Sequence, residues 1–183
     1  IISRTPYRLS FFGGGTDYNS WYEKNGGLVI AVGLAHYCYI NIRKLPPFFE
    51  HKHRIVYSKM EHVNDTNDID HPSVRACINH KEIQNGLEIH YDGDLPARSG
   101  IGSSSSFTVG LLNSLSYLKN KKISKISLAN EAIYVEQDIL KESVGVQDQI
   151  MSATGGFQSI ILSKKRKWKT QEFSLSQDYM KNL

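Results

Sequence analysis

A glycine- and serine-rich segment near the middle of the chain has the residue types of a phosphate-binding loop. Pro96 opens it, Gly100 and Gly102 follow with one residue between them, and the four serines at 103–106 lead into an apolar run. Glycine lets backbone N–H groups face a ligand closely, and serine hydroxyls cap a helix or reach a metal ion. A helix that begins there binds anions through its N–H groups and its dipole. We therefore predict a phosphate site over 100–106, with a capped surface helix as the alternative.

Two familiar phosphate-binding motifs do not fit this segment. A Walker A loop ends in Gly-Lys-Ser/Thr, and the segment 96–106 contains no lysine. A dinucleotide-binding fingerprint needs a third glycine or alanine, where this chain has Ser105. It also needs an acidic residue about twenty positions later, where the chain has a lysine-rich run. The sequence excludes both motifs.

A second group of glycines follows the first expected strand, residues 1–12. Glycines at a strand end permit unusual backbone conformations and leave room for a ligand. A short carboxylate beside them can accept hydrogen bonds from hydroxyl groups, and the alternative is that it or the preceding threonine caps a short helix over 19–24. The candidate substrate-binding residues are Gly13, Gly14, Gly15, Thr16 and Asp17.

Two further carboxylates are candidates for chemistry. Apolar spacing predicts an amphipathic helix over 127–141, capped by Ser127, and Glu136 falls on or beside its apolar stripe. A carboxylate there must be compensated, either by a magnesium ion or by a nearby lysine or arginine. Asp148 follows a turn at Gly145 between apolar residues, which suits a partly shielded carboxylate or a helix cap.

Three motifs resemble those of the GHMP kinases, the family of galacto-, homoserine, mevalonate and phosphomevalonate kinases. The segment 96–104 is similar to their ATP loop, Pro-x-x-x-Gly-Leu-Gly-Ser-Ser, with Ile101 in place of leucine. The segment 13–18 resembles Gly-Glu-His-Thr-Asp-Tyr of the galactokinase-like enzymes, with glycines in place of Glu and His. With these glycines, the segment resembles the branch of the family that phosphorylates heptose phosphates and fucose at the anomeric carbon. The segment 145–148 resembles the motif that supplies the acidic residue beside the acceptor hydroxyl.

The resemblance implies an ATP-dependent, magnesium-dependent sugar kinase. The implied reaction transfers the γ-phosphate to O1 of D-glycero-D-manno-heptose 7-phosphate and gives the 1,7-bisphosphate. A fucokinase, another GHMP sugar kinase and a non-catalytic nucleotide-binding fragment are the alternatives. The implied roles are Asp148 and Arg8 in catalysis, Ser104 and Glu136 at magnesium, and Pro96, Gly100, Ile101, Gly102, Ser103, Ser104, Ser105 and Ser106 at ATP.

The elements that must position these residues are strands mixed with helices. Strands are expected near 1–12, 27–34, 36–44, 53–58, 86–92, 157–162 and 168–174, and helices near 18–24, 73–83, 103–118 and 127–141. This order predicts an α+β fold with helices against one sheet face. The resemblance implies the GHMP kinase N-terminal domain over 1–183, related to a domain of ribosomal protein S5. The C-terminal ferredoxin-like domain has no counterpart in 1–183, so we expect a fragment, a cleaved product or one piece of an interrupted protein.

Composition adds weaker constraints. The net charge of +4 suits anionic ligands, and no stretch approaches the ~20 apolar residues of a membrane span. Cys38 and Cys77 fit no metal spacing and are expected to be reduced thiols of a cytoplasmic protein, and His51-x-His53 alone is a poor zinc pattern. The basic run 164–169 lies between two expected strands, so a hairpin end is preferred over a nucleic-acid site. We expect a small sugar phosphate as partner, neither nucleic acid nor membrane, and leave a homodimer open.

Overall fold

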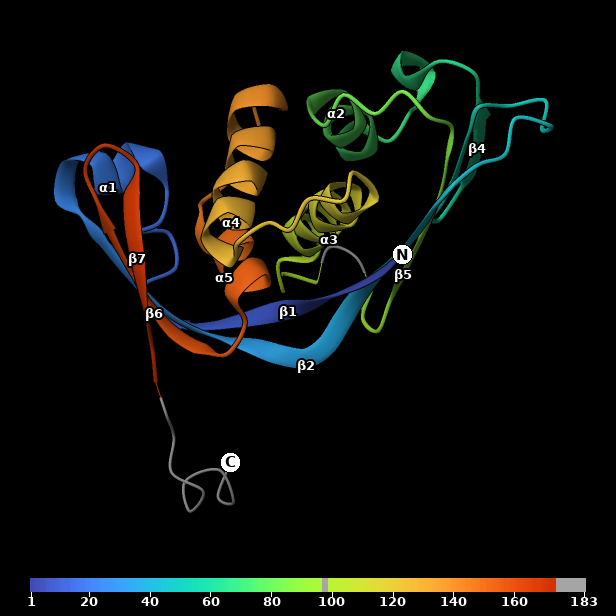
Figure 1. The fold of residues 1–183 in the computed structure, drawn as a ribbon. Coiled ribbons are helices and arrows are strands. Elements are labelled where there is room, and N and C mark those ends of the chain that lie inside the picture. Colours follow the sequence, from blue (N-terminus) through green and yellow to red (C-terminus); the bar gives the residue numbers. More distant parts are fainter. Residues whose placement is uncertain (97–98, 174–183) are drawn as a thin grey trace.

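The computed structural model describes residues 1–96 and 99–173, and over these ranges seven strands form one curved sheet (Figure 1). Helices α3, α4 and α5 lie on its concave side, and α1 and α2 lie toward opposite ends. The strands are β1 (Ile2–Phe12), β2 (Gly27–Lys44), β3 (His53–Val56), β4 (Met60–Val63), β5 (Leu87–Gly93), β6 (Phe157–Ser163) and β7 (Lys167–Glu172). The helices are α1 (Asn19–Asn25), α2 (Pro72–His80), α3 (Ser103–Leu118), α4 (Lys125–Ile133) and α5 (Gln147–Thr154), with a 3₁₀ turn η1 (Thr66–Asp68) and a π-helical segment η2 (Tyr134–Ile139).

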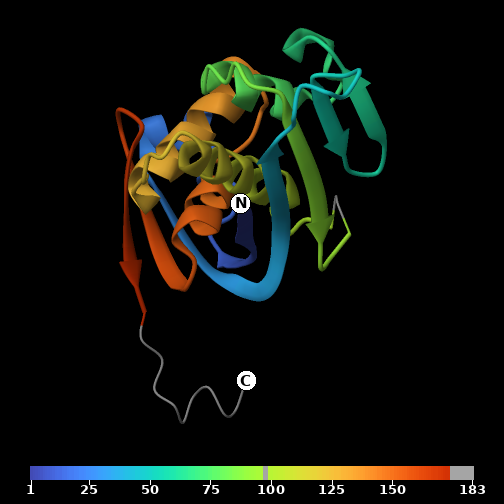
Figure 2. The ribbon, with the colours of Figure 1, turned by 45° about the vertical axis from the view of Figure 1, so that its right-hand side comes forward.

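The long strand β2 organises the sheet. Its first half pairs with β6, its second half pairs with β5, and β1 pairs with it along most of its length, all antiparallel. Strand β3 runs parallel to β5, and the order of the sheet is β4-β3-β5-β2-β6-β7. Figure 2 shows β2 curving beneath α3, so that one bent strand supports both ends of the helical layer.

The register of β1 against β2 shifts just before Arg8. Pro6 pairs with Tyr37, but Arg8 pairs with Gly33, so β2 carries extra residues at this point. Such irregularities bend a strand and re-aim side chains, often next to functional sites. The Gly33 N–H leaves the pairing pattern and donates to Gly156 O at 2.8 Å. Because β1 holds both halves together, the two strands expected over 27–34 and 36–44 are one continuous, bent strand.

Helix α3 is fixed closely against β1. Its buried face contributes Leu111, Leu112 and Leu115 to the main hydrophobic cluster. Gly110 lets the helix approach the strand, since a side chain there would lie 2.7 Å from Thr5 Oγ1, and Ser3 Oγ donates to Gly110 O at 3.0 Å. These contacts hold the middle of α3 against the start of β1. Ser106 Oγ, which donates to Pro6 O at 3.0 Å, holds the first turn of α3 near Arg8.

The α+β prediction is confirmed, and the differences lie in local elements. The helix expected over 127–141 is α4 followed by η2, and Ser124 rather than Ser127 caps it by accepting from Ser127 N at 3.1 Å. Helix α5 and strand β4 were not predicted, because eight and four residues are too short to show a clear period. Within the described ranges, no helix is both long and apolar enough to cross a bilayer.

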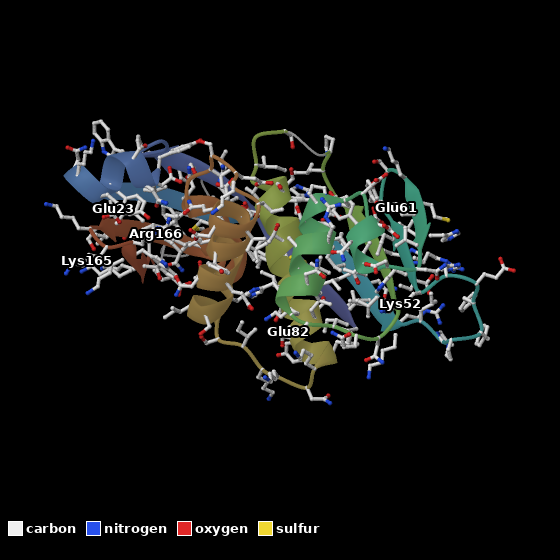
Figure 3. The ribbon with its side chains drawn as sticks, turned by 90° about the horizontal axis from the view of Figure 1, so that it is seen from above. Glu23, Lys52, Glu61, Glu82, Lys165 and Arg166 are labelled. Carbon is white, nitrogen blue, oxygen red and sulfur yellow. The ribbon has the colours of Figure 1, made fainter. Side chains whose placement is uncertain are left out.

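The basic run 164–169 closes the β6–β7 hairpin, as the preferred interpretation predicted. The backbone N–H groups of Lys165 and Arg166 donate to the Glu23 carboxylate of α1 at 2.9 and 2.6 Å (Figure 3). The guanidinium of Arg166 contacts both oxygens of Asp138 at 3.0 and 2.8 Å. Part of the positive charge of this run is therefore already paired within the molecule.

Candidate active site

A pocket of about 560 Å³ lies at the N-terminus of α3. Three features of the chain meet there: the glycine- and serine-rich loop, an Arg–Asp pair and a group of aromatic rings. Its walls are formed by Arg8, Tyr57, Ser58, His71, Pro72, Ser73, Tyr91, Gly100, Gly102, Ser103, Ser104, Phe107, Glu142 and Asp148. The loop and helix start predicted to bind phosphate thus border a space large enough for a small-molecule ligand.

The glycines of the loop take conformations that other residues avoid. Gly100 and Gly102 have φ angles of +75° and +74°, and Gly102 immediately precedes the first residue of α3. A side chain at Gly102 would lie 3.1 Å from Asp148 Oδ2, whereas one at Gly100 would meet nothing within 4 Å. The loop therefore passes very close to Asp148. Pro96 is exposed and accepts a hydrogen bond from Ser99 Oγ at 2.7 Å, and residues 97–98 lie outside the described part of the chain.

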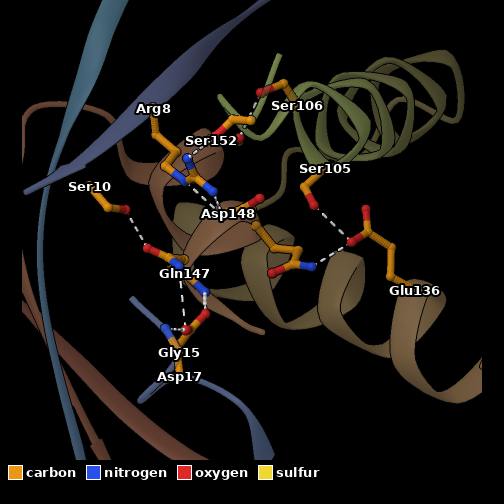
Figure 4. A network of polar contacts seen from close by, with 12 residues as sticks. Arg8, Ser10, Gly15, Asp17, Ser105, Ser106, Glu136, Gln147, Asp148 and Ser152 are labelled. Atoms are coloured by element: carbon orange, nitrogen blue, oxygen red, sulfur yellow. Dashed lines mark hydrogen bonds and ion pairs between the residues drawn. The ribbon is translucent and has the colours of Figure 1, made fainter. Parts of the chain in front are cut away.

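The four serines divide into two pairs. Ser103 and Ser104 lie on the pocket wall. Ser105 and Ser106 are buried, and their hydroxyls point into the protein: Ser105 Oγ donates to Glu136 Oε2 at 2.8 Å, and Ser106 Oγ donates to Pro6 O at 3.0 Å (Figure 4). The side chains of 105 and 106 therefore fasten α3, and only 103 and 104 present side chains to the pocket.

Arg8 joins the loop, the strand and the candidate acidic residue. Its Nε donates to Asp148 Oδ1 at 2.7 Å, and Nη2 lies 2.7 Å from the same oxygen. Nη1 donates to Gly100 O at 2.7 Å, and the backbone N–H of Arg8 donates to Ile101 O at 3.0 Å. The side chains of Arg8 and Asp148 are 13% and 26% exposed, so this ion pair lies at the pocket wall and is partly shielded from water.

Opposing effects act on the pKa of Asp148. Burial raises the pKa of its carboxyl, the Arg8 guanidinium lowers it, and the Asp17 carboxylate raises it. The net shift is upward, so desolvation outweighs the arginine. Asp148 is the second residue of α5, where the helix dipole also favours the ionised form.

Glu136 lies beneath the loop rather than on the pocket wall. It is 1% exposed, and its Oε2 accepts hydrogen bonds from Ser105 and from Gln149 Nε2, while Oε1 has no hydrogen-bond partner within the described ranges. Burial raises the pKa of this carboxyl to about 7, against the lowering effect of the side chains of Gln149, Ser105 and Thr108. The alternative of a lysine or arginine partner is wrong, because a hydroxyl and an amide take that place.

A magnesium ion fits this carboxylate in one respect. The unpartnered Oε1 is the kind of hard oxygen ligand that Mg²⁺ takes, and Ser104 lies on the pocket wall. Within the described ranges, no three His, Cys, Asp or Glu side chains gather into a metal-binding cluster. An ion here would therefore take most of its ligands from water or phosphate, as Mg²⁺ commonly does.

The predicted sugar-binding segment is placed beside the start of α5 and outside the pocket. Asp17 is 0% exposed, and it caps no residue of α1, whose N-terminal cap is Tyr18 without a side-chain hydrogen bond. Thr16 Oγ1 donates to Gly13 O at 2.7 Å, and a side chain at Gly13 would collide with Leu28 O. The alternative that Thr16 or Asp17 caps the helix over 19–24 is therefore wrong. A sugar would reach the Asp17 carboxylate only if this segment moved.

Sequence reasoning missed the aromatic wall, and it gave no separate role to the two glutamines beside Asp148. His71 stacks on Phe107 with ring centroids 4.8 Å apart, and Tyr91 meets Phe107 edge-on at 5.4 Å. Gln147 and Gln149 flank Asp148 and contact Asp17 and Glu136, respectively. Their positions on either side of Asp148 could have suggested that the glutamines help to position the site. The rings are far apart in the sequence and gave no signal.

Comparison with known proteins finds a family model that matches part of this chain. Residues 72–156 match the family model described as the GHMP kinases N terminal domain. That range includes α2, α3, η2 and α5, and so it covers the loop, Glu136 and Asp148. The N-terminal strand with Arg8 and the glycines at 13–15 lies before it.

Individual relatives agree with the family match. The chain is 25% identical over 166 residues to D-glycero-alpha-D-manno-heptose 7-phosphate kinase of Campylobacter jejuni, covering 86% of this chain and 49% of that protein. A D-glycero-D-manno-heptose 1-phosphate kinase structure from Bacteriodes thetaiotaomicron superimposes with a TM-score of 0.86 at 22% identity, covering 96% of this chain and 60% of that one. Lactococcus lactis galactokinase, solved with galactose, gives a TM-score of 0.73 at 21% identity, covering 96% of this chain and 47% of that one. The chain thus spans about half the length of the curated relative that it matches.

Proposed function

We propose that this chain, which has the fold of a GHMP kinase N-terminal domain, takes part in transferring the ATP γ-phosphate to a sugar hydroxyl. The observation that carries the proposal is the Arg8 side chain, which contacts Asp148 Oδ1 and Gly100 O at 2.7 Å each. The Arg8 side chain thereby bridges an acidic residue and the proposed phosphate-binding loop. Phosphoryl transfer depends mainly on such positioning and on charge neutralisation.

The pocket supports binding of the nucleotide. Phosphate groups would lie at the N-terminus of α3, over Gly100, Gly102, Ser103 and Ser104, where backbone N–H groups and the helix dipole favour anions. The aromatic wall, formed by Phe107 and the rings around it, offers an apolar surface for the base. Ile101 shapes the loop through its backbone, and the hydroxyls of 105 and 106 hold the helix that presents it.

Magnesium is the cofactor that this proposal requires. Glu136 and Ser104 would hold it, and the ion when bound would neutralise charge on the phosphate oxygens. The unpartnered Oε1 supports the role of Glu136. Ser105 holds the carboxylate in place through the other oxygen.

Asp148 would act on the acceptor hydroxyl. Its carboxylate would accept the hydroxyl proton while the hydroxyl oxygen bonds to the γ-phosphorus and ADP leaves. Arg8 would hold the Asp148 carboxylate in place and offset negative charge in transfer, which its contacts with Asp148 and the loop support. The upward shift of the Asp148 pKa, caused by burial, brings this base nearer to neutral pH.

The proposed acceptor is O1 of D-glycero-D-manno-heptose 7-phosphate. The names of the Campylobacter jejuni and Bacteriodes thetaiotaomicron relatives support a heptose phosphate, and the glycines at 13–15 support this branch of sugar kinases. A fucokinase or another sugar kinase of the family would share every motif. A nucleotide-binding domain without turnover is the second candidate, because the pocket at the N-terminus of α3 favours phosphate binding whether or not a transfer follows.

Phosphorus NMR on this chain with Mg²⁺ and ATP distinguishes these cases. The panel of acceptors is heptose 7-phosphate, fucose and mannose, and Asp148→Asn serves as the inactive control. A new anomeric phosphate with matching ADP supports a sugar kinase and identifies its acceptor. ATP binding without product in any reaction supports the binding domain. Absence of ATP binding would overturn both.

A further inference from the structure

The buried carboxylate of Asp17 is occupied by the start of helix α5. Its Oδ2 accepts from the backbone N–H of Gln147 at 3.1 Å, and its Oδ1 accepts from Gln147 Nε2 at 3.3 Å and from Gly15 N at 3.0 Å (Figure 4). The Asp17 carbonyl also accepts from Val146 N at 3.2 Å. Aspartate is favoured at a helix N-terminus because it satisfies free N–H groups and complements the dipole. Here the aspartate comes from a segment 130 positions away in the sequence.

The chain before α5 is shaped around this carboxylate. A side chain at Gly145 would collide with Asp17 Oδ2. Only glycine therefore allows the backbone to pass this close to the carboxylate. The contact therefore depends on two residues together, the buried Asp17 and the glycine at 145.

The residues that follow carry this constraint to the candidate active site. Gln147, held by Asp17, also accepts a hydrogen bond from Ser10 of β1. The next residue, Asp148, accepts a hydrogen bond from the side chain of Arg8, which also lies on β1. The first turn of α5 is therefore fixed at one end by Asp17 and along its side by β1.

We propose that Asp17 is a positioning residue, which fixes the first turn of α5 and so holds Asp148 against Arg8, and that it is not a ligand of the acceptor. The importance of Asp148 in this statement rests on the proposed kinase function. Three observations support it: the 0% exposure of Asp17, the occupation of both its oxygens by protein N–H groups, and its position outside the pocket.

The test compares Asp17→Asn with a matched control, Asp65→Asn. Asp65 is also an aspartate that accepts from a backbone N–H in the first turn of a short helix, at 2.8 Å from Asn67 N, but on η1 away from α5. Two NMR signals report the contact directly: hydrogen exchange at the Gln147 amide and at the Arg8 Nε–H. Both are measured on this chain without nucleotide or sugar, so their outcome does not depend on the kinase proposal.

We expect Asp17→Asn to accelerate exchange at both groups by about tenfold or more relative to amides of α3, since hydrogen bonds to charged groups are the stronger ones. Gly145→Ala, which leaves Asp17 unchanged, should produce the same pattern, and it serves as the second variant if Asp17→Asn is too unstable. Asp65→Asn should leave both signals unchanged. Unchanged Gln147 and Arg8 signals in both Asp17→Asn and Gly145→Ala would overturn the proposal.

Kinetics add a second discrimination where the chain turns over. A positioning role predicts that Asp17→Asn lowers kcat and leaves the sugar KM unchanged. A rise in sugar KM together with unchanged Arg8 exchange would assign Asp17 to the acceptor and overturn the proposal. Failure of the kinase proposal would be visible separately, as absence of product with the wild-type chain.

Discussion

The hydroxyl of Ser105 donates a hydrogen bond to Glu136 Oε2 at 2.8 Å, which ties the first turn of α3 to η2. Gln149 of α5 donates to the same oxygen, and in the described part of the chain Oε1 accepts no hydrogen bond. Short π-helical segments inside helices are often found at functional sites, and η2 is such a segment. Glu136 is thus held through Oε2, while its buried Oε1 has no hydrogen-bond partner among the described residues. A buried carboxylate in this state favours the binding of a cation or a proton.

The first prediction concerns the pH dependence of stability. Burial raises the pKa of Glu136 to about 7 in the folded chain, against 4.5 as its ordinary value. The folded state therefore holds this proton more tightly, and the free energy of unfolding should fall as pH rises from about 4.5 to about 7, by about 3 kcal/mol in total. Urea unfolding at several pH values measures it. In Glu136→Gln, which cannot titrate, this component should vanish, and a wild-type-minus-variant difference that stays constant between pH 5 and 8 would contradict the assignment.

The second prediction concerns magnesium at the same carboxylate. If Glu136 binds the ion, Mg²⁺ should increase the affinity for a non-hydrolysable ATP analogue in the wild type and much less in Glu136→Gln. Calorimetric titration with and without Mg²⁺ gives both affinities. Asp65→Asn, which removes a distant exposed carboxylate, is the control and should retain the full magnesium effect. Equal magnesium effects in wild type and Glu136→Gln would remove Glu136 from the metal site.

The third prediction concerns Asp148→Asn in a chain that turns over. Loss of the base should reduce kcat by about 100-fold or more, because general-base catalysis typically contributes that much. Nucleotide affinity should be spared, since the loop keeps its own contacts. Equal turnover would remove Asp148 from the mechanism, and lost nucleotide affinity would point to a metal-site role. In the wild type, the acid limb of the pH–rate profile should lie above the ordinary aspartate range, because burial raises the pKa of this carboxyl.

The sequence predicted the parts of the site that consist of short local patterns. The glycine- and serine-rich loop was recognised because glycine spacing and a following helix are local features, and the structure places α3 over the predicted range, Ser103–Leu118. The α+β class followed from alternating strand and helix patterns. The joint roles of Arg8 and Asp148 in catalysis came only from the family resemblance, because no local pattern relates residues 140 positions apart.

What the sequence could not predict depends on tertiary packing. The burial of Ser105 and Ser106 follows from how α3 lies against β1 and η2. Because the four residues at 103–106 are all serines, the sequence does not indicate which two face the pocket. The capping of α5 by Asp17 depends on Gly145 allowing a close approach, which no sequence period reveals. The single bent strand β2 arises because β1 pairs with both of its halves, whereas the sequence predicted two strands, over 27–34 and 36–44.

The fourth prediction concerns the two cysteines. Both are fully buried, and burial raises the pKa of the Cys38 thiol to about 12 and also raises that of the Cys77 thiol. Because the thiolate is the reactive form, neither should react with an alkylating reagent in the folded chain. Labelling followed by mass spectrometry should show modification of both together, at a rate that follows unfolding. Rapid labelling of either cysteine under native conditions would show that its surroundings open locally.

The fifth prediction compares two glycines that share a backbone conformation and differ in their surroundings. Gly100→Ala and Gly102→Ala both place a side chain at a φ near +75°, so each should lose about 1 kcal/mol or slightly more of unfolding free energy. Only Gly102→Ala brings its new methyl group to 3.1 Å from Asp148 Oδ2 and 3.4 Å from Arg8 Cγ. The backbone cost is therefore common to both variants, and any additional effect of Gly102→Ala reports the contact with the Arg8–Asp148 pair. We expect that effect as faster exchange of the Arg8 Nε–H, and as lower kcat in a chain that turns over. If both variants alter the Arg8 signal equally, loop strain alone explains it, and the close passage of the loop over Asp148 has no consequence for the pair.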